Sequence, residues 1–291
     1  MRSGSPARSQ LTRSNAGVIV NRRYNERAAV PQPHGCHDCA AQELGFDMAL
    51  HKKLIAGNWK MNCERADGLA LAGELAVRAK ADPPACDMLV CPPATLIFAV
   101  GFTISGSGIA LGGQDCHAAP KGAFTGDISA EMLKDAGCSY VIIGHSERRH
   151  FRGETDADAR AKVEAAWRAG LTAILCVGET RAEREAGKAL AVVCGQLAGS
   201  VPEGAAADKL VVAYEPVWAI GSGLTPTLAD IEEIHRALRA ELPAGTRILY
   251  GGSVNPKNCA DILAIEDVDG GLVGGASLKS EDFWAIAQAF R

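Results

Sequence analysis

A repeating alternation of apolar and helical segments is the feature of this 291-residue chain that most limits its fold. Short apolar runs recur about every 30 residues, which is the size of one strand–helix–strand unit. Short, continuous apolar runs are typical of strands that are buried on both faces of a parallel sheet. Eight such runs are present, at residues 54–57, 88–91, 109–112, 140–144, 173–177, 210–214, 247–250 and 271–273.

The segments between these runs carry the spacing of amphipathic helices. Apolar residues at 228, 231, 234 and 238 form one stripe, and Thr227 with Asp230 forms a capping box ahead of it. Eight strands alternating with helices, in about the 250 residues that such a domain needs, predict an α/β fold in the form of a (β/α)8 barrel. An open, doubly wound parallel sheet is the structural alternative.

The domain organisation follows from a change in composition near residue 47. Residues 1–47 contain six Arg, no Lys and no sustained periodicity, so we expect a disordered N-terminal extension. The extension resembles an organellar transit peptide in part. Met48 lies just ahead of the first apolar run, which favours the alternative that 1–47 is a start-site artefact. Residues 48–291 are predicted to form the single barrel domain.

Composition excludes several classes of function. A formal net charge of −4 makes the chain a poor nucleic-acid binder, and no apolar stretch approaches the ~20 residues that cross a bilayer. The ten cysteines are dispersed, which argues against a disulfide scaffold and for a reducing, cytoplasmic location. Cys36 and Cys39 form a single C-x-x-C without a second matching pair, so we predict no metal site.

Polar residues directly follow several predicted strands, at the edge where such barrels place their active sites. Asn58 and Lys60 follow the first strand, His145 follows the fourth and Glu215 follows the sixth. A partly desolvated carboxylate can act as a general base, and a facing imidazole can polarise a carbonyl. With Lys60 and Asn58 supplying charge and a donor, the set suits proton abstraction next to a carbonyl through an enediolate-like intermediate.

Glycine-rich segments follow the last two predicted strands, at residues 251–253 and 274–277. Glycine allows backbone N–H groups to approach an anion closely, and barrels often bind phosphate between these two loops. Two tight turns are the structural alternative for either segment alone. Residues 221–223, Gly-Ser-Gly, follow an apolar tip and are predicted to belong to a lid.

Five motifs together resemble the triosephosphate isomerase family: AGNWKMN at 56–62, residues 126–133, IGHSERR at 143–149, AYEPVWAIG at 213–221 and YGGSV at 250–254. The resemblance covers about residues 53–290 and implies a TIM barrel. It implies the interconversion of dihydroxyacetone phosphate and D-glyceraldehyde 3-phosphate in glycolysis and gluconeogenesis, without a metal or an organic cofactor.

The resemblance also implies residue roles. Glu215 is the expected base, and His145 is the expected electrophile, neutral because the helix that begins near Ser146 lowers its pKa. Asn58 and Lys60 are expected to bind substrate, with Ser146 and Glu147 supporting them. Backbone amides of Gly221, Ser253, Gly274 and Gly275 are expected to hold the phosphate beneath a lid at 216–226.

Partners are implied in the same way. Family members are homodimers in which the loop after the third strand, here residues 115–129, inserts into the partner and brings Thr125 to the neighbouring active site. Two alternatives are a barrel that isomerises or cleaves another phosphosugar and an idle barrel retained as a binding protein. The presence of Asn58, Lys60, His145 and Glu215 argues against both.

Overall fold

The computed structural model describes residues 53–220 and 226–290. Three predicted features lie outside the described residues: the extension 1–47, the pair Cys36 and Cys39, and Gly221 with residues 222–225 of the lid. None of the helices in the described part is both long and apolar enough to cross a membrane.

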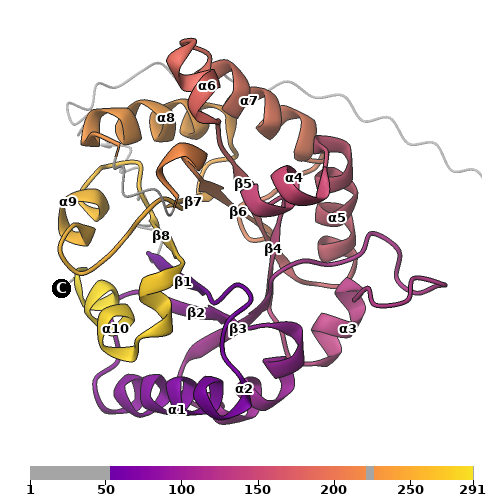
Figure 1. Cartoon of the computed structure of the whole chain (residues 1–291), viewed down its shortest axis with the longest axis vertical. Helices are drawn as coiled ribbons and strands as arrows, with labels where there is room; N and C mark the ends of the chain where they lie inside the picture. The colour runs from indigo at the N-terminus through magenta and orange to yellow at the C-terminus, as the bar shows by residue number, and fades with distance from the viewer. Residues whose placement is uncertain (1–52, 221–225, 291) are drawn as a thin grey trace, which may run out of the picture. The chain divides into compact units, whose positions relative to one another are not determined.

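The described strands form a closed parallel barrel in the order β1 to β8, surrounded by helices (Figure 1). Pairing of β1 with β8, from Leu54 opposite Gly270 to Gly57 opposite Val273, closes the sheet and rules out the open, doubly wound alternative. The predicted (β/α)8 barrel is therefore confirmed. Each predicted strand is present, with bounds that differ by one residue at most: β1 Leu54–Asn58, β2 Asp87–Cys91, β3 Ile109–Gly113, β4 Tyr140–Ile143, β5 Thr172–Val177, β6 Leu210–Tyr214, β7 Arg247–Tyr250 and β8 Gly270–Val273.

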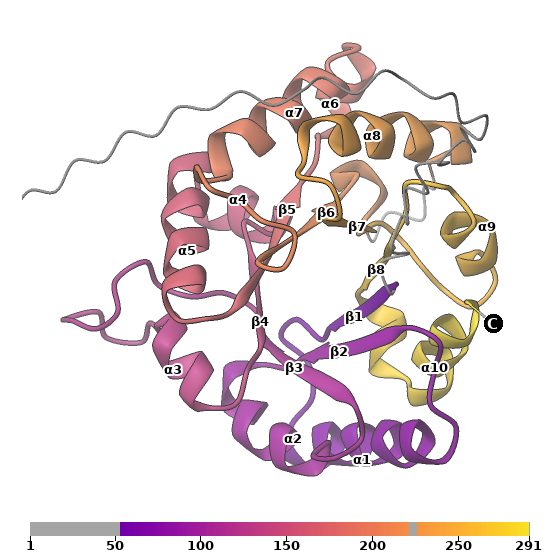
Figure 2. The ribbon, with the colours of Figure 1, turned by 180° about the vertical axis from the view of Figure 1, so that it is seen from behind.

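Helices follow the strands around the outside of the barrel, as the reverse view shows (Figure 2). Thr227 and Asp230 form the predicted capping box of α8. Ile231, Ile234 and Leu238 are fully buried, but Leu228 is 47% exposed, because it is the first residue of the helix and precedes the packed turns. The helices are α1 Arg65–Ala81, α2 Ile97–Thr103, α3 Ala130–Asp135, α4 Ser146–Arg152, α5 Asp156–Arg168, α6 Arg181–Glu185, α7 Ala189–Ser200, α8 Leu228–Glu241, α9 Cys259–Leu263 and α10 Ser280–Gln288, with 3₁₀ turns η1 Ala94–Leu96, η2 Val217–Ala219 and η3 Gly275–Leu278.

Both faces of the sheet are apolar because each face packs against its own core. Leu54 and Ala56 belong to a cluster that fills the barrel, whereas Ile55 belongs to the larger cluster between strands and helices. Successive residues of a strand alternate between the two faces, so a strand buried on both needs an unbroken apolar run. Cys91 and Cys176 lie in the inner cluster as buried free thiols, where a thiol packs as a small hydrophobic group.

Candidate active site

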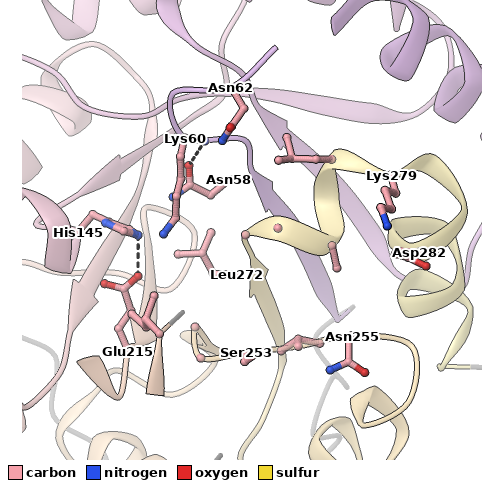
Figure 3. A pocket seen from close by; sticks show the side chains of 18 residues that line it. Asn58, Lys60, Asn62, His145, Glu215, Ser253, Asn255, Leu272, Lys279 and Asp282 are labelled. Carbon is pink, nitrogen blue, oxygen red and sulfur yellow. Dashed lines mark hydrogen bonds and ion pairs between the residues drawn. The ribbon is translucent and has the colours of Figure 1, made fainter. Parts of the chain in front are cut away.

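A cavity of about 540 Å³ opens at the carboxyl ends of the strands (Figure 3). Polar residues that follow β1, β4 and β6 line one part of it, and the glycine-rich segments after β7 and β8 line another. All the predicted site residues within the described part of the chain are brought together here: Asn58, Lys60, His145, Glu215, Ser253, Gly274 and Gly275.

His145 and Glu215 form a buried pair at one side of the cavity, and Figure 3 shows the imidazole facing the carboxylate. His145 Nε2 lies 2.9 Å from Glu215 Oε1, and the Ser146 backbone N–H donates to Oε2 over 2.8 Å. Both side chains are less than a tenth exposed. The carboxylate is therefore fixed at both oxygens by residues of the β4–α4 junction.

Hydrogen bonds define the tautomer of His145. The N–H of Glu147 donates to Nδ1 over 3.2 Å, because His145 is the N-cap of α4. Because Nδ1 accepts this hydrogen bond with its lone pair, the proton of a neutral ring resides on Nε2 and points at Glu215.

The charges of the pair are coupled. Burial lowers the pKa of His145, but the Glu215 carboxylate outweighs this and raises it above its ordinary value. For Glu215, burial raises the pKa, whereas His145 and the Ser146 N–H hold it below its ordinary value. The resemblance implied a lowered pKa for His145. While His145 contacts Glu215, its pKa is raised instead, because the negative carboxylate stabilises the protonated imidazole.

Lys60 adopts a backbone conformation that is rare for a side-chain-bearing residue, with φ of +50°. Its N–H donates to Asn58 Oδ1 over 3.0 Å, which explains why Asn58 is needed two residues earlier. Its ammonium group lies 2.6 Å from Glu147 Oε1 and points toward His145 (Figure 3). The loop after β1 thus delivers a cation beside the buried pair.

Gln114 is a site residue that sequence reasoning missed. Its side-chain amide donates to the carbonyls of Lys60, over 2.8 Å, and Cys91, over 2.9 Å. It therefore stabilises the unusual backbone of Lys60 from the end of β3. The signal was available, since Gln114 directly follows the third strand as Asn58 ends the first.

Close packing explains the glycines after β7. A Cβ at Gly251 would lie 2.8 Å from Glu215 Cγ, and one at Gly252 would lie 2.2 Å from the Tyr250 hydroxyl. Both positions therefore need glycine for the side chains beside them. After β8, Gly274 precedes the 3₁₀ turn η3, and its carbonyl accepts from Ser277 Oγ over 2.6 Å. The segments at Ser253, Gly274 and Gly275 line the same cavity as Lys60.

Comparison with known proteins decides the family. The family model described as triosephosphate isomerase matches residues 53–290. The chain belongs to the triosephosphate isomerase family. Curated relatives are triosephosphate isomerases of Afipia carboxidovorans, 62% identical over 82% of this chain and 97% of theirs, and of Rhodopseudomonas palustris, 57% identical over 82% and 98%.

A solved structure agrees with the family. The crystal structure of triosephosphate isomerase from Bartonella henselae is 46% identical, covers 82% of this chain and 99% of its own, and superposes with a TM-score of 0.77. The chain is thus a triosephosphate isomerase, an enzyme of glycolysis.

Proposed function

We propose that Glu215 is the base that moves the proton between the two carbons of the triose phosphate. A base must be ionised and close to the proton that it removes. Glu215 is 2% exposed, borders the cavity, and is held as a carboxylate by His145 and the Ser146 N–H. This anchored, water-shielded carboxylate is the single observation that carries the proposal.

His145 acts as the electrophile on the substrate oxygens. In the free enzyme the Nε2 proton of His145 faces Glu215. Once the carboxylate turns toward the substrate carbon, this N–H can donate its hydrogen bond to the substrate carbonyl instead. When the pair separates, burial and the Glu147 N–H at Nδ1 both favour the neutral ring. A neutral donor stabilises the enediolate without transferring a full charge.

Lys60 and Asn58 bind the substrate, and the glycine-rich segments bind its phosphate. The Lys60 ammonium stabilises developing negative charge, with Glu147 holding it near His145. Backbone amides of Ser253, Gly274 and Gly275 bind the phosphate, together with Gly221, which lies outside the described residues. Closure of the segment 216–226 over the site would exclude water and discourage phosphate elimination from the enediolate.

The working form is a cytoplasmic homodimer. The segment between β3 and α3 projects away from the barrel (Figures 1 and 2). Phe124 on this segment is 45% exposed, and Met61 and Phe151 are 94% and 73% exposed, which is unusual for large apolar side chains. Asp115, at the base of the segment, is fixed by Lys162 and Arg148. Insertion of 115–129 into a second copy, with Thr125 entering the neighbouring site, would bury these side chains.

The test of the base is Glu215→Gln in the full chain, beside the matched surface control Glu185→Gln. Glutamine preserves shape but cannot accept a proton, so kcat on D-glyceraldehyde 3-phosphate should fall by about 10³-fold or more. Inhibition by inorganic phosphate should survive, because the phosphate segments are unchanged. A Glu215→Gln enzyme that turns over like the control would remove Glu215 from the role of base.

Sedimentation equilibrium of the full chain tests the proposed homodimer, and a monomer at the concentration used in the assay would contradict it.

A further inference from the structure

Arg149, on α4, donates hydrogen bonds to four groups on four different segments. Its Nε donates to the Gly144 carbonyl over 2.8 Å, and one terminal nitrogen donates to the Cys176 carbonyl over 3.3 Å and Ser200 Oγ over 3.1 Å. The other terminal nitrogen lies 2.5 Å from Asp156 Oδ1. All three guanidinium nitrogens are therefore engaged, although the residue does not line the 540 Å³ cavity.

The bond to Gly144 fixes the peptide that enters His145. The carbonyl of Gly144 and the N–H of His145 belong to one rigid plane, so holding the oxygen holds the backbone from which the imidazole projects. Gly144 has φ of +66°, and a Cβ there would meet the guanidinium at 3.1 Å. Arg149 therefore packs against the left-handed glycine at the end of β4, and this glycine directly precedes His145.

The bond to Cys176 connects this unit to the neighbouring strand. The last pair of the β4–β5 ladder joins Ile143 and Leu175, so Gly144 and Cys176 are the next residues along each strand. The guanidinium of Arg149 donates hydrogen bonds to the carbonyls of both Gly144 and Cys176, one residue beyond that last pair on each strand. Cys176 in turn pairs with Ala213, two residues before Glu215. Arg149 therefore connects the strand end that carries His145 to the strand beside the one that carries Glu215.

We propose that Arg149 is a positioning residue for the isomerisation, which sets the His145–Glu215 geometry by clamping the ends of β4 and β5. The inference rests on the proposed roles of His145 and Glu215. Asp156 and the fully buried Ser200 orient the guanidinium, since Ser200 Oγ also donates to Asp156 over 3.2 Å. Lysine cannot replace this residue, because a single ammonium cannot reach carbonyls on two strands and keep the planar fork.

The experiment compares Arg149→Lys with Arg160→Lys in the full chain. Arg160 is a matched control, because it too donates to two carbonyls, those of Ala198 and Gly199 at the end of α7, but neither of these bonds reaches β4 or β5. For Arg149→Lys, kcat should fall about 10- to 100-fold, since a misplacement of up to about 1 Å can cost as much as about 10²-fold in rate. KM and the inhibition constant of inorganic phosphate should stay within about threefold, because Arg149 does not line the cavity that Ser253, Gly274 and Gly275 border.

A merely structural role predicts a different pattern. In that case the loss of kcat in Arg149→Lys would match the loss in Arg160→Lys for the same loss of thermal stability. That result would overturn the proposal. A folded Arg149→Lys enzyme with kcat within about twofold of the parent would overturn it too. Should Arg149→Lys fail to fold, Asp156→Asn decides, since it leaves the arginine in place but loosens its orientation, and a fall in kcat at constant KM is again expected. Failure of the proposed function would appear separately, as unchanged turnover in Glu215→Gln.

Discussion

Gly178 offers the sharpest test of how the barrel places the base. It follows β5 directly and is buried against the next strand. A Cβ built at this position would lie 1.7 Å from the Glu215 carbonyl oxygen and 2.7 Å from its carbonyl carbon. Contacts of 3.0–3.4 Å are the closest that a Cβ tolerates, so Gly178→Ala must separate the two backbones by about 1.3–1.7 Å, the difference between those limits and 1.7 Å.

The magnitude follows from this displacement. Misplacement of a catalytic group by about 1 Å costs roughly 10²-fold in rate, or about 2.7 kcal/mol of transition-state stabilisation. The shift cannot be absorbed by a flexible side chain, because the obstructing atoms are main-chain atoms. We therefore expect kcat of Gly178→Ala to fall by about 10²-fold or more, with a smaller change in KM.

The assay is turnover of D-glyceraldehyde 3-phosphate, coupled to a dehydrogenase that consumes the product, with Gly195→Ala as the matched control. Gly195 lies in α7, and within the described residues no heavy atom beyond its chain neighbours and the adjoining helix backbone lies within 4 Å of the position that a methyl group would occupy there. Alanine at Gly195 should therefore stabilise the protein by about 0.5–1 kcal/mol and leave kcat unchanged. A folded Gly178→Ala protein with kcat within about threefold of the parent would refute the reasoning.

Two further predictions concern the half-buried Gln114 and the fully buried His235. Gln114→Leu should raise KM about tenfold, because the carbonyls of Lys60 and Cys91 lose their shared donor, and steady-state kinetics would disprove this if KM stayed unchanged. Burial lowers the pKa of His235 to about 4. The unfolded chain binds a proton below about pH 6.5 and the folded protein does not, so stability should fall by about 3 kcal/mol as pH drops from about 6.5 to about 4. Denaturant unfolding of His235→Gln should show that this part of the fall in stability between about pH 6.5 and about pH 4 is gone. A free energy of unfolding that depends on pH as steeply as in the parent would contradict the assignment.

Much of the site was predictable because it is encoded locally. Asn58, Lys60, His145 and Glu215 each follow an apolar run, and parallel strands in a barrel deliver their carboxyl ends to one face.

Leu228 shows the limit of periodicity, since its spacing fits the buried stripe but the packed part of α8 begins one turn later. A stripe gives the direction of a side chain and not the extent of the surface that covers it.

By itself, the sequence determined the eight strands, the capping box of α8 and the polar residues at the strand ends, because apolar period and cap chemistry act over a few residues. Only the tertiary structure decided that Ser146 fixes Glu215, that Gln114 supports the backbone of Lys60, and that a methyl group at Gly178 would collide with the base. Those contacts join residues tens of positions apart, and their geometry depends on strand register and barrel closure. Register and closure come from all the strand pairings acting together, so no local pattern encodes them.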